Sequence, residues 1–274
     1  MSLTKNIILW VLAIIIMSGF AIYQRTTGPT YPFRGQIELE GEKIKFSLPR
    51  THEGNTDQKV YIIVKNREIK AEMNYRRHPS HDDWTTIDMM RSDDSLIAFI
   101  PNQPPAGKIM YNINLIKNTG EKVKLIEKPV ITRFKGVVPN WLLITHIIFV
   151  FSAVIFSTRT AFEAIFKGKN YVKLTLITLI LMFFGVVIFG PIMQYYAFGE
   201  FWTGWPLKGW LNFGDLTDNK SAVMFLGWLI AYFKIRKNPD KKHWIYIAAI
   251  ITIATFLIPH SLMGSEIDYT KIKN

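Results

Sequence analysis

Hydrophobic residues gather in five long runs, one at the start of the chain and four in its second half. The runs cover residues 7–23, 141–158, 174–193, 221–235 and 244–259. A helix needs about 20 apolar residues to cross a hydrocarbon core of about 30 Å. Most of the runs approach that length, although the fourth, at about fifteen residues, is short for a span. The pattern predicts a multi-domain membrane protein with five transmembrane α-helices.

Between the first two runs, over residues 36–135, short segments alternate between polar and apolar positions. Clear examples are residues 43–48, 60–64, 96–100 and 108–115. Alternation with a period of two is typical of antiparallel strands that bury one face. About eight such segments predict an extracytoplasmic all-β sandwich of the immunoglobulin kind.

Charges between the apolar runs predict the orientation of the chain, because short loops rich in Lys and Arg remain cytoplasmic. Two such loops are read as inner ones: residues 159–173, where a single Glu163 accompanies Arg159, Lys167, Lys169 and Lys173, and residues 234–243. The rule places the N-terminus inside and the β-domain and C-terminus outside, which indicates a cytoplasmic (inner) membrane protein. The expected domains are an N-terminal transmembrane anchor (1–23), the β-sandwich (24–138) and a four-helix transmembrane domain (139–274) with an outer loop at 194–220.

The first run also fits a cleaved signal peptide, with Lys5 before the apolar stretch and small residues at Gly19 and Ala21. Ile22 and Tyr23 follow without a polar break, which favours an uncleaved anchor.

Composition excludes several classes of protein. The chain has no cysteine, so disulfides and thiolate-bound metals are excluded. Its net charge of +12 is concentrated in the inner loops, which fits contact with anionic lipid in the bilayer. Nucleic acid is not an expected partner, because no basic stripe with interleaved aromatics occurs. Phosphate-binding glycine loops and hydrolase motifs are absent from the sequence.

Part of the β-region resembles the fibronectin-III and immunoglobulin-like domains of bacterial surface proteins. The resemblance rests on a strand ending in Tyr-Arg, a tryptophan strand, a hairpin, and a Pro-Ala-Gly turn into a tyrosine strand, at residues 75–77, 84–87, 96–101 and 105–113. It implies a fold and no catalytic residues. Trp84 and Tyr111 are expected in the core, as in such modules.

Two other segments resemble an uncharacterised family of bacterial polytopic membrane proteins, to which no activity is attached. They are residues 201–220, with Trp202, Trp205 and Trp210, and residues 260–269.

Histidines supply the candidate metal ligands. His78 and His81, followed by Asp82 and Asp83, could be drawn as a metal site, but Pro79 and Ser80 between them favour a solvated loop.

In the membrane half, His146 and His260 are expected on different helices at a similar depth near the outer face. Two imidazoles so placed could ligate haem b or a transition metal. A helix-interface histidine that bonds a neighbouring carbonyl is the alternative.

The loop at 194–220 is rich in aromatic residues, as interfacial belts are. We expect Trp202, Trp205 and Trp210 to form an aromatic cap over the outer helix ends. Beneath it, an outer polar cluster is expected, composed of Asp215, Asp218, Lys220, Glu266 and Asp268.

These features favour an accessory or assembly subunit, whose outer β-sandwich and aromatic cap bind a membrane or periplasmic protein partner. The alternative is a membrane redox or metal protein that uses His146 and His260.

Overall fold

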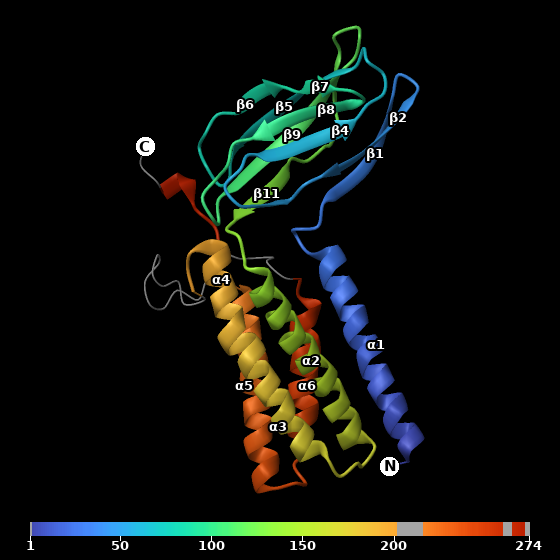
Figure 1. Cartoon of the computed structure of the whole chain (residues 1–274), viewed down its shortest axis with the longest axis vertical. Helices are drawn as coiled ribbons and strands as arrows, with labels where there is room; N and C mark the ends of the chain where they lie inside the picture. Colours follow the sequence, from blue (N-terminus) through green and yellow to red (C-terminus); the bar gives the residue numbers. More distant parts are fainter. Residues whose placement is uncertain (1, 202–215, 260–264, 272–274) are drawn as a thin grey trace. The chain divides into compact units, whose positions relative to one another are not determined.

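The computed structural model describes residues 2–201, 216–259 and 265–271. Contacts divide the chain into two units (Figure 1). The helical unit contains residues 1–29 and 138–264, and the β unit contains residues 30–137 and 265–274.

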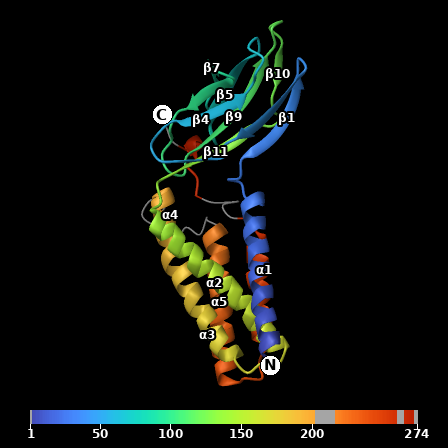
Figure 2. The same ribbon diagram turned by 45° about the vertical axis from the view of Figure 1, so that its right-hand side comes forward.

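The helical unit is a bundle in which the helices lie side by side (Figures 1 and 2). Helix α1 packs on α2 and α6, and α5 packs on α3 and α6. In its core the indole N–H of the fully buried Trp228 donates to Thr252 Oγ1 at 2.9 Å. The helices are α1 (Leu3–Thr27), α2 (Asn140–Ile165), α3 (Tyr171–Met182), α4 (Gly190–Phe198), α5 (Leu216–Lys237) and α6 (His243–Leu257).

Within the described residues, three helices are long and apolar enough to cross a membrane. They are α1, α2 and the continuous helix Tyr171–Phe198, with 25, 26 and 28 residues. Helix α6 is apolar but has only 15 residues, and α5 does not meet the same criterion of length and apolarity. The finding is therefore three candidate spans and not five.

Two helices extend beyond the apolar runs that mark them. Helix α2 continues past Thr158 to Ile165, so the interpretation of Arg159 and Glu163 as loop residues is wrong. Helix α5 has 22 residues, so the expectation of a helix of about fifteen residues there is also wrong. The residues of α2 beyond the apolar run include Arg159, Ala161, Glu163 and Ala164, which have good helix propensity, and Arg236 and Lys237 likewise extend the C-terminal end of α5.

A π-helical segment, η1 (Phe183–Phe189), joins α3 to α4. The N–H of Gly190 donates to the carbonyl of Gly185, five residues earlier. Pro191 follows; it has no N–H, and its ring would clash with the carbonyl four residues before it in a regular α-helix. The wider i→i+5 spacing accommodates the proline.

The β unit is made of short strands in three sheets (Figure 1). Strands β1 and β2 form a hairpin; the order of the second sheet is β3-β11-β9-β5-β6, with β10 on β9, and that of the third is β4-β8-β7. All pairs are antiparallel except β3 with β11. The strands are β1 (Phe33–Leu39), β2 (Glu42–Leu48), β3 (Thr51–Glu53), β4 (Gln58–Ile63), β5 (Lys70–Arg77), β6 (Thr85–Asp88), β7 (Met90–Ser92), β8 (Ser95–Ile100), β9 (Lys108–Ile116), β10 (Lys122–Lys124) and β11 (Val130–Lys135).

One hydrophobic core draws on all three sheets. It includes Ile44 of β2, Leu96 of β8 and Tyr111 of β9, all at most 2% exposed. The Tyr111 hydroxyl donates to the Pro49 carbonyl at 2.8 Å, and the core position of this residue is confirmed. The expectation for Trp84 is wrong: it is 39% exposed and lies under the Arg76 guanidinium, 4.9 Å from its ring centroid. It precedes β6, which among the described strands is the last in the order of its sheet and pairs on one side only.

Candidate functional site

The β unit carries an open groove with a volume of about 630 Å³. One wall is residues 33–36 of β1, and the opposite wall is residues 125–131, which lead into β11. Phe46 and Arg50 also line it.

The β1–β2 hairpin is built by its turn and its register. Glu40 and Gly41 both have positive φ, 49° and 78°, which is typical of a two-residue type I′ turn. Leu39 pairs with Glu42 next to the turn, and Gly35 pairs with Phe46 further along. The Phe46 ring lies directly on Gly35, where a Cβ atom would come within 2.4 Å of Cζ. Glycine is therefore required at this position of the groove wall.

The groove combines apolar and cationic surfaces. Phe33, 45% exposed, stacks on Phe46 with ring centroids 6.2 Å apart. The cationic residues of the lining are Arg34, Arg50 and Lys128, while Glu127 is its one acid. Burial lowers the pKa of Arg50, and within the described residues its side chain has no ion pair. A half-buried cation without a counter-charge favours an acidic ligand.

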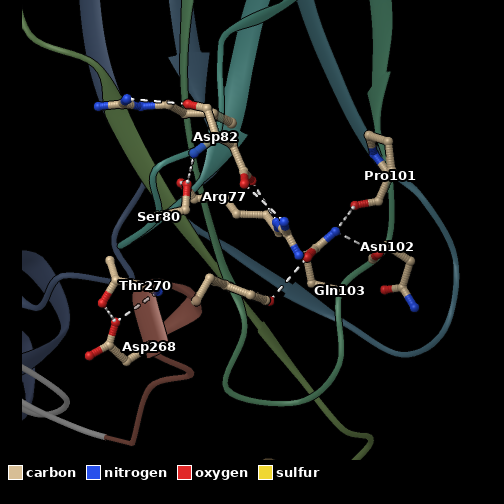
Figure 3. A network of polar contacts seen from close by, with 10 residues as sticks. Arg77, Ser80, Asp82, Pro101, Asn102, Gln103, Asp268 and Thr270 are labelled. Carbon is tan, nitrogen blue, oxygen red and sulfur yellow. Dashed lines mark hydrogen bonds and ion pairs between the residues drawn. The ribbon is translucent and has the colours of Figure 1, made fainter. Parts of the chain in front are cut away.

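The C-terminal segment, residues 265–271, packs on a different part of the β unit (Figure 3). The Tyr269 N–H donates to the Pro79 carbonyl at 3.1 Å, and its hydroxyl donates to Gln103 Oε1 at 3.0 Å. The Arg77 guanidinium covers the Tyr269 ring at 4.8 Å from its centroid and pairs with Asp82 at 2.6 Å. This hydrogen-bonded pair holds the pKa of Asp82 below its usual value.

The loop at residues 78–83 is therefore occupied by contacts within the β unit. Asp82 is paired with Arg77, and the backbone N–H of His78 donates to the backbone carbonyl of Lys108 at 2.9 Å. Burial is the main cause that lowers the pKa of His78. Across the ranges that the structure describes, no group of three or more His, Cys, Asp or Glu residues could hold a metal ion.

Of the two predicted histidine ligands, only His146 is described. It lies on α2, and its Nδ1 is 2.9 Å from the Gly185 carbonyl of η1. A carbonyl can only accept, so Nδ1 carries a proton, and in the neutral imidazole Nε2 then has the lone pair. His260 lies outside the described residues.

Three members of the predicted outer polar cluster have described side-chain contacts. Lys220 is 7% exposed and its Nζ donates to the Ile258 carbonyl, just past α6, at 2.6 Å. Glu266 pairs with Lys108, and Asp268 pairs with Lys271 at 3.0 Å. The hydrogen bond from the Thr270 hydroxyl is the main reason that the pKa of Asp268 is lowered. Asp218 lies in α5; Asp215 and the aromatic cap residues Trp202, Trp205 and Trp210 are outside the described residues.

The end of α6 also receives polar side chains from α1. The Gln24 side-chain amide donates to the carbonyls of Phe256 and Ile258, and the Tyr23 hydroxyl donates to that of Leu257. Helix C-termini leave their last carbonyls without intrahelical partners. Gln24 and Lys220 supply those partners, and the Lys220 charge also suits the negative end of the helix dipole.

Helix α2 contains a buried ion pair that was not predicted from the sequence. Arg159 and Glu163 are 3% and 2% exposed, with Nη1 and Oε2 2.7 Å apart but not aligned for a hydrogen bond. Arg159 Nη2 donates to Asn6 Oδ1 at 2.6 Å, and the guanidinium lies 5.5 Å from the Trp10 ring centroid. The Asn170 N–H donates to Glu163 Oε1 at 3.1 Å. The pair thus joins α1, α2 and the turn before α3.

No protein-family model matches the chain, and no curated protein matches it.

Proposed function

We propose that this chain is an integral membrane accessory or assembly subunit that binds a protein partner through its β unit. The observation that carries the proposal is the groove between β1 and residues 125–131, with apolar walls and cationic side chains. Protein-binding surfaces combine apolar anchors with polar groups that fix orientation. The expected aromatic cap, with Trp202, Trp205 and Trp210, would give the partner a second contact in the helical unit.

The proposal includes a specific membrane arrangement. Helices α5 and α6 would complete five crossings. Helix α5 with 22 residues spans about 33 Å, whereas α6 with 15 residues spans about 22 Å, so the bilayer would have to thin around α6. The β unit would be an immunoglobulin-like sandwich on the outer face of the cytoplasmic membrane, with the N-terminus inside. Its support is the basic segment 234–243, the two sheets with strand orders β3-β11-β9-β5-β6 and β4-β8-β7, and the core to which both sheets contribute. Contacts of Asn6 with α2 and of Gln24 with the end of α6 favour retention of α1.

Crosslinking in native membranes tests the proposal. A photoreactive residue placed in the β unit should yield one discrete heavier product, identified by mass spectrometry as one protein. The same residue at Lys173, an exposed position at the start of α3, should not yield that product. A chain that purifies alone and gives no discrete product from any β-unit position would contradict the proposed function.

A second candidate function is favoured by the His146 contact alone. In metal sites, a ligating histidine typically donates its second ring N–H to a carbonyl or carboxylate, which is the arrangement of His146 Nδ1 and Gly185. His146 Nε2, with His260, would then hold haem b or a transition metal.

The purified protein would then be coloured or contain stoichiometric metal, and the signal would be lost in both His146→Ala and His260→Ala. His243→Ala, at the start of α6, is the matched control and should retain it. A colourless protein without stoichiometric metal by elemental analysis would remove this candidate.

A further inference from the structure

We propose that the groove of the β unit binds an extended, acidic polypeptide segment of a partner protein, which adds as a strand along the free edge of β1. The proposal rests on the proposed partner-binding function and names the chemistry of the partner. It derives from the edges of the strands, the charges of the lining and the charge of the hairpin itself.

The first wall of the groove offers unpaired backbone groups. In the described residues β1 pairs only with β2. Leu39 and Glu42 close a two-residue turn, so they form a hydrogen-bonded pair, and such pairs alternate along the hairpin. Arg34 and Gln36 fall on the other positions, and their N–H and C=O groups point away from β2. These are the groups that an added strand would use.

The opposite wall offers a second edge. The Arg133 N–H of β11 donates to the Arg50 carbonyl on the side of β3, at 3.1 Å. Ile131, two residues earlier, directs its backbone groups to the same side. Strand β3 pairs with β11 only from Arg133 onward, so the edge at Ile131 is not covered by β3. An extended chain in the groove would therefore meet strand edges on both sides.

The side chains of the groove specify an acidic ligand with apolar residues between the acids. An added strand presents successive side chains to opposite faces. Phe33 and Phe46 supply apolar contact, while Arg34, Arg50 and Lys128 supply positive charge against the single Glu127. Strand addition combines main-chain hydrogen bonds with pockets for alternate side chains, and this lining fits that mode.

A second copy of this chain matches the charge of the groove less well than an acidic segment does. The β1–β2 hairpin carries Arg34, Lys43 and Lys45 against Glu38, Glu40 and Glu42, so it has no net charge. The cationic lining is complemented better by a segment with an excess of Asp or Glu. We therefore assign the groove to a different protein, one with such acids in an extended segment.

The test uses the full-length protein in native membranes, with a photoreactive residue at Gln36 beside the groove. A second labelled protein carries it at Tyr61, an exposed position on β4, a strand of another sheet. Crosslinked peptides are mapped by mass spectrometry. We expect the Gln36 product to map to an extended segment of the partner that contains Asp or Glu.

Charge reversal then separates the groove from the rest of the β unit. Arg50→Glu and Lys128→Glu should each lower the yield at Gln36 by about tenfold or more, and Arg50→Lys should restore much of it. Arg67→Glu, an exposed cation outside the groove lining, is the matched control and should leave the yield unchanged. An Asp or Glu to Lys change in the mapped segment should recover the yield with Arg50→Glu. Resistance to a short protease pulse checks that each variant is folded.

Several outcomes overturn the proposal. They are a Gln36 product with lipid, a product with the hairpin of a second copy, a mapped segment without acids, and a yield that Arg50→Glu and Lys128→Glu leave unchanged. A partner captured only from Tyr61 would remove the groove assignment and leave the proposed function standing. No product from either position would remove both.

Discussion

Replacing Arg159 with methionine should lower the free energy of unfolding of the helical unit by about 3–5 kcal/mol. Glu163 is only 2% exposed, and the change leaves its carboxylate without a cation. It also removes the hydrogen bond from Arg159 to Asn6. Breaking a buried ion pair from one side is costly because an uncompensated charge remains. Unfolding of the full chain in mixed micelles with increasing SDS, followed by tryptophan fluorescence and circular dichroism, measures the loss.

The double variant Arg159→Met, Glu163→Met tests whether the charge is the cause. Since neither charge remains, it should recover most of the stability, as hydrophobic replacements of buried ion pairs often do. Lys173→Met, which removes an exposed cation from α3, should change the free energy by no more than about 0.5 kcal/mol. If the double variant is as unstable as Arg159→Met, lost packing rather than an unpaired charge explains the effect.

The turn after α2 depends on the same pair. Gly168 lies against the Glu163 side chain, where a Cβ atom would come within 2.1 Å of its carboxyl carbon. The sequence shows Gly168 and Glu163 as an ordinary loop glycine and an isolated acid. Only the continuation of α2 to Ile165 brings them together. The apolar pattern locates the middle of a membrane helix well. Charged residues that pair with each other inside a bundle cannot be distinguished by that pattern from charged residues in a loop.

Pattern was more informative in the β unit. Alternation identified the strand-rich region, which the structure gives as residues 33–135, and the resemblance to immunoglobulin-like modules placed Tyr111 correctly in the core but Trp84 wrongly. Tyr111 lies on β9, between β5 and β11, where alternate side chains are covered. Trp84 precedes the edge strand β6, and its environment depends on how much sheet lies beyond it. Whether a strand is central or at an edge depends on residues far away in the chain. Local alternation of polar and apolar residues therefore does not predict it.

The groove could not be predicted for a related reason. Its walls, residues 33–36 and 125–131, are about ninety positions apart in the chain and meet only in the fold. A local signal exists at Gly35, since a glycine inside a strand often marks close approach of another group. The partner in that approach, the Phe46 ring, follows from the hairpin register and its two-residue turn.

Phe46→Ala should lower the free energy of unfolding of the β unit by about 3–5 kcal/mol, the usual cost of truncating a buried phenylalanine. Phe46 is 8% exposed, belongs to the core and covers Gly35. Phe33→Ala removes the stacked ring from the groove side, but Phe33 is 45% exposed and the loss should be about 1 kcal/mol or less. Pulse proteolysis of the full chain across a urea series, with cleavage followed in the β unit, measures both.

Gly35→Ala distinguishes the fit between Gly35 and the ring from simple hydrophobic burial. Alone it should destabilise the β unit, because the new Cβ atom would occupy a position 2.4 Å from Phe46 Cζ and displace the ring. Combined with Phe46→Ala it has no ring to displace, so the double variant should be less unstable than the sum of the single losses. Strict additivity would show that the two residues do not interact. The same variants separate stability from binding: Phe33→Ala should lower crosslinking from Gln36 while the β unit stays folded, because Phe33 offers its exposed face to the groove.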